Sequence, residues 1–275
     1  MSSASSPASH AEAIPPGWMR PDLGQGARAL MSARAGGISV PPYDACNLGD
    51  HVGDAPEAVA HNRDRLAACL AAQPVWMTQV HGNRVVRLRA SDLAALDRRA
   101  DGAVCIEPGL ACVVMVADCL PLLLAAPQGR GVAALHAGWR GLAGVGALCE
   151  GGHSIVRTGV QALCDATSAD PADLRVWLGP CIGPTQFEVG ADVLQGFGVD
   201  PGAAQGHPRF RPAPTASGQP KWWADLTGLA RDVLNAQGVQ QVTGGTWCTA
   251  SDGARFFSYR RDGRCGRQAA AICCG

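Results

Sequence analysis

The sequence carries little charge and no excess of either sign. Only 17% of its 275 residues are charged, and 23 lysines and arginines balance 23 aspartates and glutamates. Proteins that bind nucleic acid or an anionic membrane usually show a clustered basic excess. We therefore expect neither of these partners and favour a small-molecule ligand for a monomer or small homo-oligomer.

Long apolar runs are missing as well. Asp118, Pro121 and many glycines interrupt every stretch that approaches the roughly 18 apolar residues of a membrane span. The first residues, MSSASSPASHAE, are small and polar, and no basic segment followed by an apolar stretch marks a signal peptide. These absences predict a cytoplasmic protein.

The twelve cysteines include no C-x-x-C pair, which argues against zinc ribbons and thioredoxin-type redox chemistry. The chain is also much longer than the small secreted domains that depend on disulfides. Several cysteines lie inside apolar runs, where a reduced thiol behaves as a small buried hydrophobe. We expect most of them to be reduced core residues.

Hydrophobic patterning predicts strands and helices that are interspersed without a regular βαβ period. Residues 1–14 are expected to form a disordered tail, and residues 15–275 a single domain without internal repeats. The fold class is therefore α+β, a mixed sheet with flanking helices. Strands are expected at Ala27–Ala33, Val75–Val80, Val85–Leu88, Cys112–Val116, Leu122–Ala125, Val132–Leu135, Leu174–Leu178 and Val239–Val242.

Helical spacing of apolar residues predicts helices over Pro56–Ala72 and Trp222–Ala236, and a further helical stretch after His136. The run GPCIGP, Gly179–Pro184, is too rich in glycine and proline for either element and predicts a rigid loop. The segment Ala203–Gln219, with repeated proline, glycine and alanine, is expected to be a surface loop.

Three apolar strands end at a possible metal ligand that a turn-forming or small residue follows. They are TQVHG with His81, VMVADCLP with Cys119 and VAALHAGWRG with His136. Strand ends can present side chains into a common cleft, and a His, Cys, His set suits Zn²⁺ while leaving a fourth position open. Their spacing alone matches no compact metal motif, so their convergence is a hypothesis at this point.

Six segments in chain order resemble the YfiH/laccase-domain family, and the match extends from Pro15 to Gly275. Besides TQVHG, the resemblance rests on these runs: NLGDHVGDAP followed by His61, Asn62 and Arg63, then ADCLPLLL, HAGWRG, LGPCIGPTQFEVG and FFSYRRDGRCGRQAA. One departure is DGAVC at Asp101–Cys105, where Cys105 stands in place of the hydroxyl of the family pattern ADAxxT.

The resemblance implies a YfiH-like mixed α/β sandwich, related to the catalytic domain of cytotoxic necrotizing factors. It also implies zinc bound by His81, Cys119 and His136. Cu²⁺ is a possible substitute, because copper exceeds zinc in intrinsic affinity for such ligands. Family members are described as purine nucleoside enzymes that deaminate adenosine and phosphorolyse adenosine, inosine and methylthioadenosine. Purine nucleosides and phosphate are therefore the expected small-molecule partners.

Several residues near the matched motifs are candidates for the chemistry. Asp118 and Glu188 are candidate proton carriers for deamination. A guanidinium suits phosphate, which makes Arg140 a candidate and, near the C-terminus, Arg260, Arg261 and Arg267. The other candidates for substrate contact are Asn47, Gln79 and Cys181. A turn role explains Asn47 and a packed thiol explains Cys181 equally well, whereas a plain strand position explains Gln79 better.

Three other functions remain open. Cys119 could be the nucleophile of a cysteine hydrolase, with His136 or His81 as its base, acting on a peptidoglycan precursor. A binding protein with a structural zinc is a second alternative, but such zinc sites normally have four protein ligands. A copper-dependent polyphenol oxidase is least favoured, because none of the seven histidines form the H-x-H pairs that a three-copper cluster uses.

Overall fold

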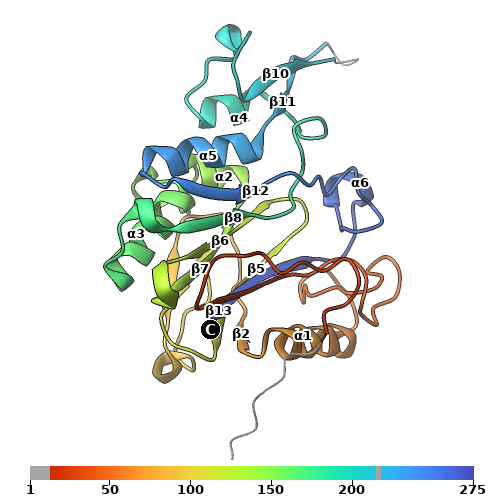
Figure 1. Cartoon of the computed structure of the whole chain (residues 1–275). Coiled ribbons are helices and arrows are strands. Elements are labelled where there is room, and N and C mark those ends of the chain that lie inside the picture. Colours follow the sequence, from red (N-terminus) through yellow and green to blue (C-terminus); the bar gives the residue numbers. More distant parts are fainter. Residues whose placement is uncertain (1–12, 215–217) are drawn as a thin grey trace, which may run out of the picture.

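In the computed structural model, residues 13–214 and 218–275 are described, and they form two large β-sheets packed face to face (Figure 1). The four-stranded sheet has the order β1-β13-β5-β2, and the six-stranded sheet has the order β12-β8-β6-β7-β4-β3. Both sheets mix parallel and antiparallel pairs, since β2 runs parallel to β5 and β3 parallel to β4. The observed fold is a mixed α+β sandwich, as predicted.

The strands of these two sheets are β1 (Ala27–Met31), β2 (Gln73–Val75), β3 (Val85–Leu88), β4 (Gly102–Cys105), β5 (Leu110–Val116), β6 (Leu120–Ala125), β7 (Val132–Ala137), β8 (Arg175–Leu178), β12 (Gln241–Gly244) and β13 (Gln268–Cys274). A small third sheet comprises β9 (Glu188–Val189), β10 (Phe210–Ala213) and β11 (Lys221–Ala224). The helices are α1 (Pro56–Leu70), α2 (Trp139–Ala143), α3 (Ile155–Thr167), α4 (Ala191–Gly196), α5 (Leu226–Ala236) and α6 (Tyr259–Asp262).

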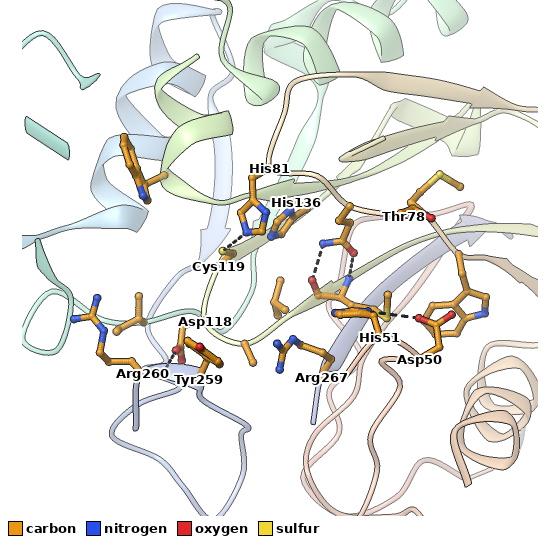
Figure 2. A pocket seen from close by; sticks show the side chains of 18 of the residues that line it. Asp50, His51, Thr78, His81, Asp118, Cys119, His136, Tyr259, Arg260 and Arg267 are labelled. Carbon is orange, nitrogen blue, oxygen red and sulfur yellow. Dashed lines mark hydrogen bonds and ion pairs between the residues drawn. The ribbon is translucent and has the colours of Figure 1, made fainter. Parts of the chain in front are cut away.

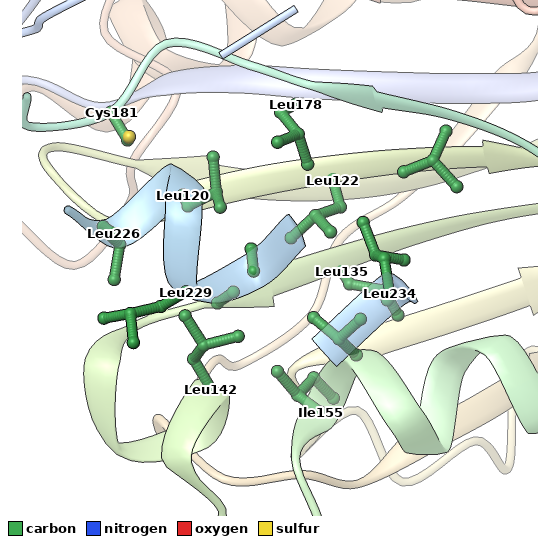
Figure 3. Close-up of a cluster of buried hydrophobic side chains, with 14 of the residues drawn as sticks. Leu120, Leu122, Leu135, Leu142, Ile155, Leu178, Cys181, Leu226, Leu229 and Leu234 are labelled. Carbon is green, nitrogen blue, oxygen red and sulfur yellow. The ribbon is translucent and has the colours of Figure 1, made fainter. Parts of the chain in front are cut away.

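Helices cover the outer faces of the sandwich, α1 on the four-stranded side and α3 and α5 on the six-stranded side (Figure 1). Alternation along β5 explains the layering, because Val113 faces the α1 side whereas Cys112 and Val114 face the space between the sheets. On the other side, leucines of β6 pack with leucines of α5 (Figure 3). Each fully buried leucine contributes about 1.5–3 kcal/mol, so this packing holds the strand ends at fixed positions.

Most predicted strands are confirmed, but several elements differ, among them the strands β4 and β9, which were not predicted. Trp222–Ala224 is β11 rather than the first turn of a helix, because the Asp225 carboxylate caps the backbone N–H of Gly228 and α5 begins only at Leu226. Phe210–Ala213, expected in a loop, pairs with β11 as β10. The strand expected to continue to Val80 ends at Val75, and β13 was not predicted although it is the central partner of β1 and β5.

Most of the predicted N-terminal tail, residues 1–12, lies outside the described residues. Within the described ranges, no helix is both long and apolar enough to cross a membrane.

Candidate metal centre

The three predicted ligands lie together at one end of the sandwich (Figure 2). Their possible ligand atoms are all within 4.8 Å of one another, and Cys119 Sγ is 3.8 Å from His81 Nε2. Register explains part of this, because Leu120 pairs with Ala137 and thereby brings the residue before β6 next to the end of β7. His136 shares the face of β7 that points between the sheets with Ala134.

The third donor comes from a turn rather than from a strand. His81 has a φ of 61°, a left-handed conformation that costs a non-glycine residue about 1–2 kcal/mol. Three successive backbone N–H groups, of Val80, His81 and Gly82, donate to the carboxylate of Asp101 over 3.2, 2.9 and 2.8 Å. These hydrogen bonds stabilise the turn and present the exposed His81 ring toward Cys119.

Small residues let the segments approach closely. A Cβ at Gly138, which follows β7, would lie 2.7 Å from His81 Cδ2 and 3.2 Å from Cys119 Sγ. A Cβ at Gly141 in α2 would lie 2.6 Å from the carbonyl oxygen of Gly82. The glycines of HAGWRG therefore make room for the His81 turn.

Charges in the trio favour a thiolate beside an imidazolium. Burial acts to raise the pKa of Cys119, but the charge of His136 and hydrogen bonds from His136 and His81 outweigh it and lower the pKa to about 6. Burial acts to lower the pKa of His136, but the Cys119 thiolate and the Asp101 carboxylate outweigh it and raise the pKa to about 9. The pKa of Asp101 is lowered, because contacts with His136 and backbone N–H groups overcome the opposing effect of burial.

The donor set fits a tetrahedral ion with one open position. At typical bond lengths, tetrahedral zinc holds sulfur and nitrogen ligands about 3.6 Å apart. The 3.8 Å between Cys119 Sγ and His81 Nε2 is close to that separation. The His81, Cys119 and His136 group could therefore hold a metal ion; its donors accept either zinc or copper.

The trio opens into a cavity of about 980 Å³. One part of its wall is largely apolar, formed by Trp139, Ile182, Phe187 and Leu226. Other parts carry four guanidinium groups, those of Arg63, Arg98, Arg260 and Arg267. A cavity of this size, with an apolar wall and a few polar groups, has the dimensions of a small-ligand site.

Four further residues from the sequence prediction line this cavity: Gln79, Asp118, Arg260 and Arg267. The Gln79 side-chain amide pairs with the backbone of Met115 through two hydrogen bonds, which takes the place of the strand pairing expected up to Val80. Asp118 accepts hydrogen bonds from Thr249 Oγ1 and from the backbone N–H of Arg260. Figure 2 shows Asp118 and Arg260 on the same side of Cys119.

Other predicted residues lie outside the lining. Cys181 is fully buried in the hydrophobic core (Figure 3), and the carbonyl oxygen of Glu188 accepts a hydrogen bond from Arg260 Nη1. Asn47 is buried and organises a turn, accepting from the backbone N–H groups of Gly49 and Arg267. The exposed Arg140 stacks on the Trp139 ring, and Arg261 pairs with Asp262.

Sequence reasoning missed Asp101, which was noted only as part of a motif departure. It is fully buried, and besides the His81 turn it contacts His136, with 2.8 Å between Oδ1 and Nδ1. The signal in the sequence was an acidic residue at the start of a run that is otherwise apolar. Arg63 and Trp76 were missed as a pair; the guanidinium lies 4.2 Å from the indole ring centroid and is also paired with Asp50.

Comparisons with known proteins identify the family of the chain. The family model described as "Multi-copper polyphenol oxidoreductase laccase" matches residues 28–275. Purine nucleoside phosphorylase YfiH of Escherichia coli is 42% identical over 262 residues, which cover 94% of this chain and 97% of that protein. A protein named purine nucleoside phosphorylase from Pseudomonas aeruginosa is 43% identical over 258 residues, covering 93% and 97% of the two chains.

Solved structures show the same fold. A Neisseria meningitidis protein matches with a TM-score of 0.79 and 37% identity, covering 94% of this chain and 99% of that one. YlmD from Geobacillus stearothermophilus matches with a TM-score of 0.76 and 32% identity, covering 90% and 92%. The chain therefore belongs to the laccase-like YfiH family that this family model describes.

Proposed function

We propose that the chain is a zinc-dependent purine nucleoside enzyme that phosphorolyses adenosine, inosine and methylthioadenosine and deaminates adenosine. The observation that carries the proposal is the His81, Cys119 and His136 trio at the wall of a ligand-sized cavity. The names of the relatives indicate the substrate class. When bound, zinc would supply Lewis acidity through the coordination position that the trio leaves open.

The apolar wall suits the purine base. Trp139, Phe187 and Leu226 offer flat or aliphatic surface on one side of the cavity, where burial of an aromatic ring is favourable. The ribose and the phosphate would then occupy the polar part of the cavity near the trio.

We assign the phosphate to Arg267. Its Nη1 donates to the carbonyl oxygens of Cys265 and Gly266, which orients the guanidinium, and no carboxylate of the described residues forms an ion pair with it. Arg63, in contrast, is already paired with Asp50. Phosphorolysis forms a bond between a phosphate oxygen and C1′ of the ribose while the bond from C1′ to the purine nitrogen breaks, so the dianion must be held on the ribose side.

Asp118 is the proposed proton carrier for both reactions. Both of its oxygens accept hydrogen bonds, from Thr249 and Arg260, which fixes the carboxylate next to Cys119 and leaves further lone pairs facing the cavity. In deamination it would take a proton from the attacking water and return it to the departing ammonia. In phosphorolysis it would take the proton of the attacking hydrogen phosphate and pass it to the leaving purine.

The deciding experiment combines metal analysis with product analysis. Purified protein is assayed for bound metal and incubated with adenosine, with and without phosphate, and inosine, adenine and hypoxanthine are separated. We expect about one zinc per chain and loss of both metal and turnover in Cys119→Ala. Full zinc occupancy with normal turnover in that variant would refute the proposal.

Arg267→Ala tests the phosphate assignment separately. A hydrogen bond to a charged group contributes about 1.5–3 kcal/mol, so kcat/KM for phosphate should fall about 10- to 100-fold while deamination is spared. Arg157→Ala removes an exposed arginine of α3 and is the matched control. Equal losses in both reactions would assign Arg267 to folding rather than to phosphate.

A cysteine hydrolase is the second candidate, favoured by the 3.8 Å contact between Cys119 Sγ and His81 Nε2 and by the lowered pKa of that thiol. A nucleophilic thiolate would need no metal. Turnover of a peptidoglycan-precursor amide that survives a chelator and is abolished by alkylation would support this alternative and exclude the zinc mechanism.

A further inference from the structure

The Asp101 carboxylate forms hydrogen bonds with two members of the trio, with the backbone of His81 and with the ring of His136. We propose that Asp101 is a positioning residue that fixes His136 through its ring and His81 through its backbone, so that both present their Nε2 atoms to one point. The proposal rests on the function proposed above in one respect, that the trio holds a metal ion. The hydrogen bonds on which the proposal is based are all between protein atoms and do not involve a metal ion.

The ring of His136 is set by the contact between Nδ1 and Asp101 Oδ1 at 2.8 Å. Since the carboxylate oxygens already accept from three backbone N–H groups, Nδ1 is the donor and carries a proton. When the ring gives up its second proton to bind a metal ion, its lone pair is therefore on Nε2, the nitrogen on the side of Cys119 and His81. The backbone adds a second restraint, because the His136 N–H donates to the Asp101 carbonyl oxygen over 2.7 Å.

The His81 turn is set by the same carboxylate. The N–H groups of Val80, His81 and Gly82 converge on it, an arrangement in which consecutive amides form a concave anion site. Here the anion is a side chain of the protein, and it holds His81 in its left-handed conformation. Without the carboxylate, the three amides would lose their hydrogen-bond acceptor. The turn would then lose the hydrogen bonds that offset the strain of the left-handed His81 backbone.

Burial restricts the position of the Asp101 side chain. Its side chain is fully buried and lies directly before β4, and its own N–H donates to the Arg84 carbonyl oxygen over 3.0 Å. Water therefore does not compete for hydrogen bonds to the carboxylate. Through these bonds the carboxylate holds the His81 turn at a fixed distance from His136 at the end of β7.

Asp101→Asn is the informative substitution because it keeps the size and changes the hydrogen bonding. Asparagine has one acceptor oxygen and one donor nitrogen, whereas all four groups around the carboxylate are donors. In one orientation the new amide faces Val80 and Gly82, and in the other it faces His81 and His136. In either orientation two hydrogen bonds are lost, because the new amide N–H groups face N–H groups that previously donated to the carboxylate.

The first measurement uses metal-free protein. Amide hydrogen exchange at Val80, His81 and Gly82 should be slow in the wild type and at least 10-fold faster in Asp101→Asn, with other β4 and β7 amides less affected. The matched control is Asp225→Asn, which removes a helix-capping carboxylate that accepts from Gly228 and Thr227 and touches none of the trio. Unchanged exchange at the turn would overturn the proposal whatever the function of the protein.

The second measurement uses Co²⁺ alone as the probe. Loss of a group that orients a metal-binding histidine typically lowers affinity 10- to 100-fold, so Asp101→Asn should bind Co²⁺ that much more weakly and with an altered visible absorption spectrum. Asp225→Asn should keep both affinity and spectrum, even if its melting temperature falls equally. If wild-type protein binds Co²⁺ but Asp101→Asn has the same affinity and spectrum, Asp101 does not position the ligands. If wild-type protein binds no Co²⁺, the metal function fails instead, and the exchange result alone decides the role of Asp101.

Discussion

The reactivity of Cys119 in metal-free protein should persist to lower pH than that of an ordinary thiol. Its pKa is about 6 against an ordinary 9.0, because the charge of His136 and hydrogen bonds outweigh the effect of burial. At pH 7 such a thiol is about 90% ionised, and one with the ordinary pKa about 1%. At pH 6 the contrast widens to about 50% against about 0.1%.

Ionisation does not translate fully into rate, because a less basic thiolate is a weaker nucleophile. With a Brønsted coefficient of about 0.45, a pKa lower by three units reduces the intrinsic rate by about 20-fold. The net advantage over an ordinary thiol is then about 4-fold at pH 7 and about 25-fold at pH 6. The pH profile is therefore a sharper signature than the rate at one pH.

The assay is alkylation by iodoacetamide between pH 5 and 9, with each cysteine followed by peptide mass spectrometry. We expect the Cys119 rate to level off above about pH 6 and to be suppressed by added zinc. Cys149 is an internal control, because burial raises its pKa and its rate should still be rising at pH 9. A Cys119 rate that falls 10-fold per pH unit between pH 8 and 6 would refute the charge arrangement described for the trio.

Three further predictions concern the same site. Zinc binding at pH 7.5 should release about one proton, because His136 has a pKa of about 9 and is protonated, whereas Cys119 has a pKa of about 6 and is already a thiolate. Proton release should increase below pH 6, where Cys119 also becomes protonated. Calorimetry in buffers of different ionisation enthalpy measures the number of protons released. Gly138→Ala should weaken metal binding about 10-fold, because its Cβ would lie 2.7 Å from His81 Cδ2, whereas Gly202→Ala, with no atom closer than 3.5 Å, should not. After loading with excess copper and dialysis, about one copper per chain should remain, because the described residues contain a single cluster of metal-ligating side chains. Four tightly held coppers with strong syringaldazine turnover would contradict both this count and the nucleoside assignment.

The sequence was sufficient to predict the trio but not what holds it together. His81, Cys119 and His136 each follow an apolar strand or extended segment and precede a turn-forming or small residue, a local pattern that reasoning from residues can detect. Asp101 offers no such pattern, since a single acidic residue before a strand usually caps a turn. Its role depends on groups 19 to 35 residues away, whose approach only the folded chain reveals.

The errors in secondary structure have a related cause. Trp222–Ala224 continues smoothly into a helical pattern, so only the pairing of Trp222 with Val189 and of Trp223 with Glu188 identifies it as a strand. Arg140 is a candidate because it follows His136 closely in sequence; in the structure its guanidinium lies over the Trp139 ring, and Arg140 is not among the residues that line the cavity. Two residues that are close in sequence lie near each other in the fold, but their spacing does not predict whether a side chain points into a cavity.

Unequal burial among the three donors bears on how metal binding and folding are linked. His136 is buried on a central strand and Cys119 directly precedes its neighbour, so the β6–β7 ladder fixes both whether or not a metal ion is present. The exposed His81 lies in a turn that no ladder holds, and the Asp101 carboxylate supplies the hydrogen bonds that order this turn. A site arranged in this way has most of its ligand geometry before the ion arrives, in contrast to zinc fingers, which are unfolded without metal. Little conformational entropy remains to be lost on binding, so metal removal should abolish turnover while leaving the sandwich folded.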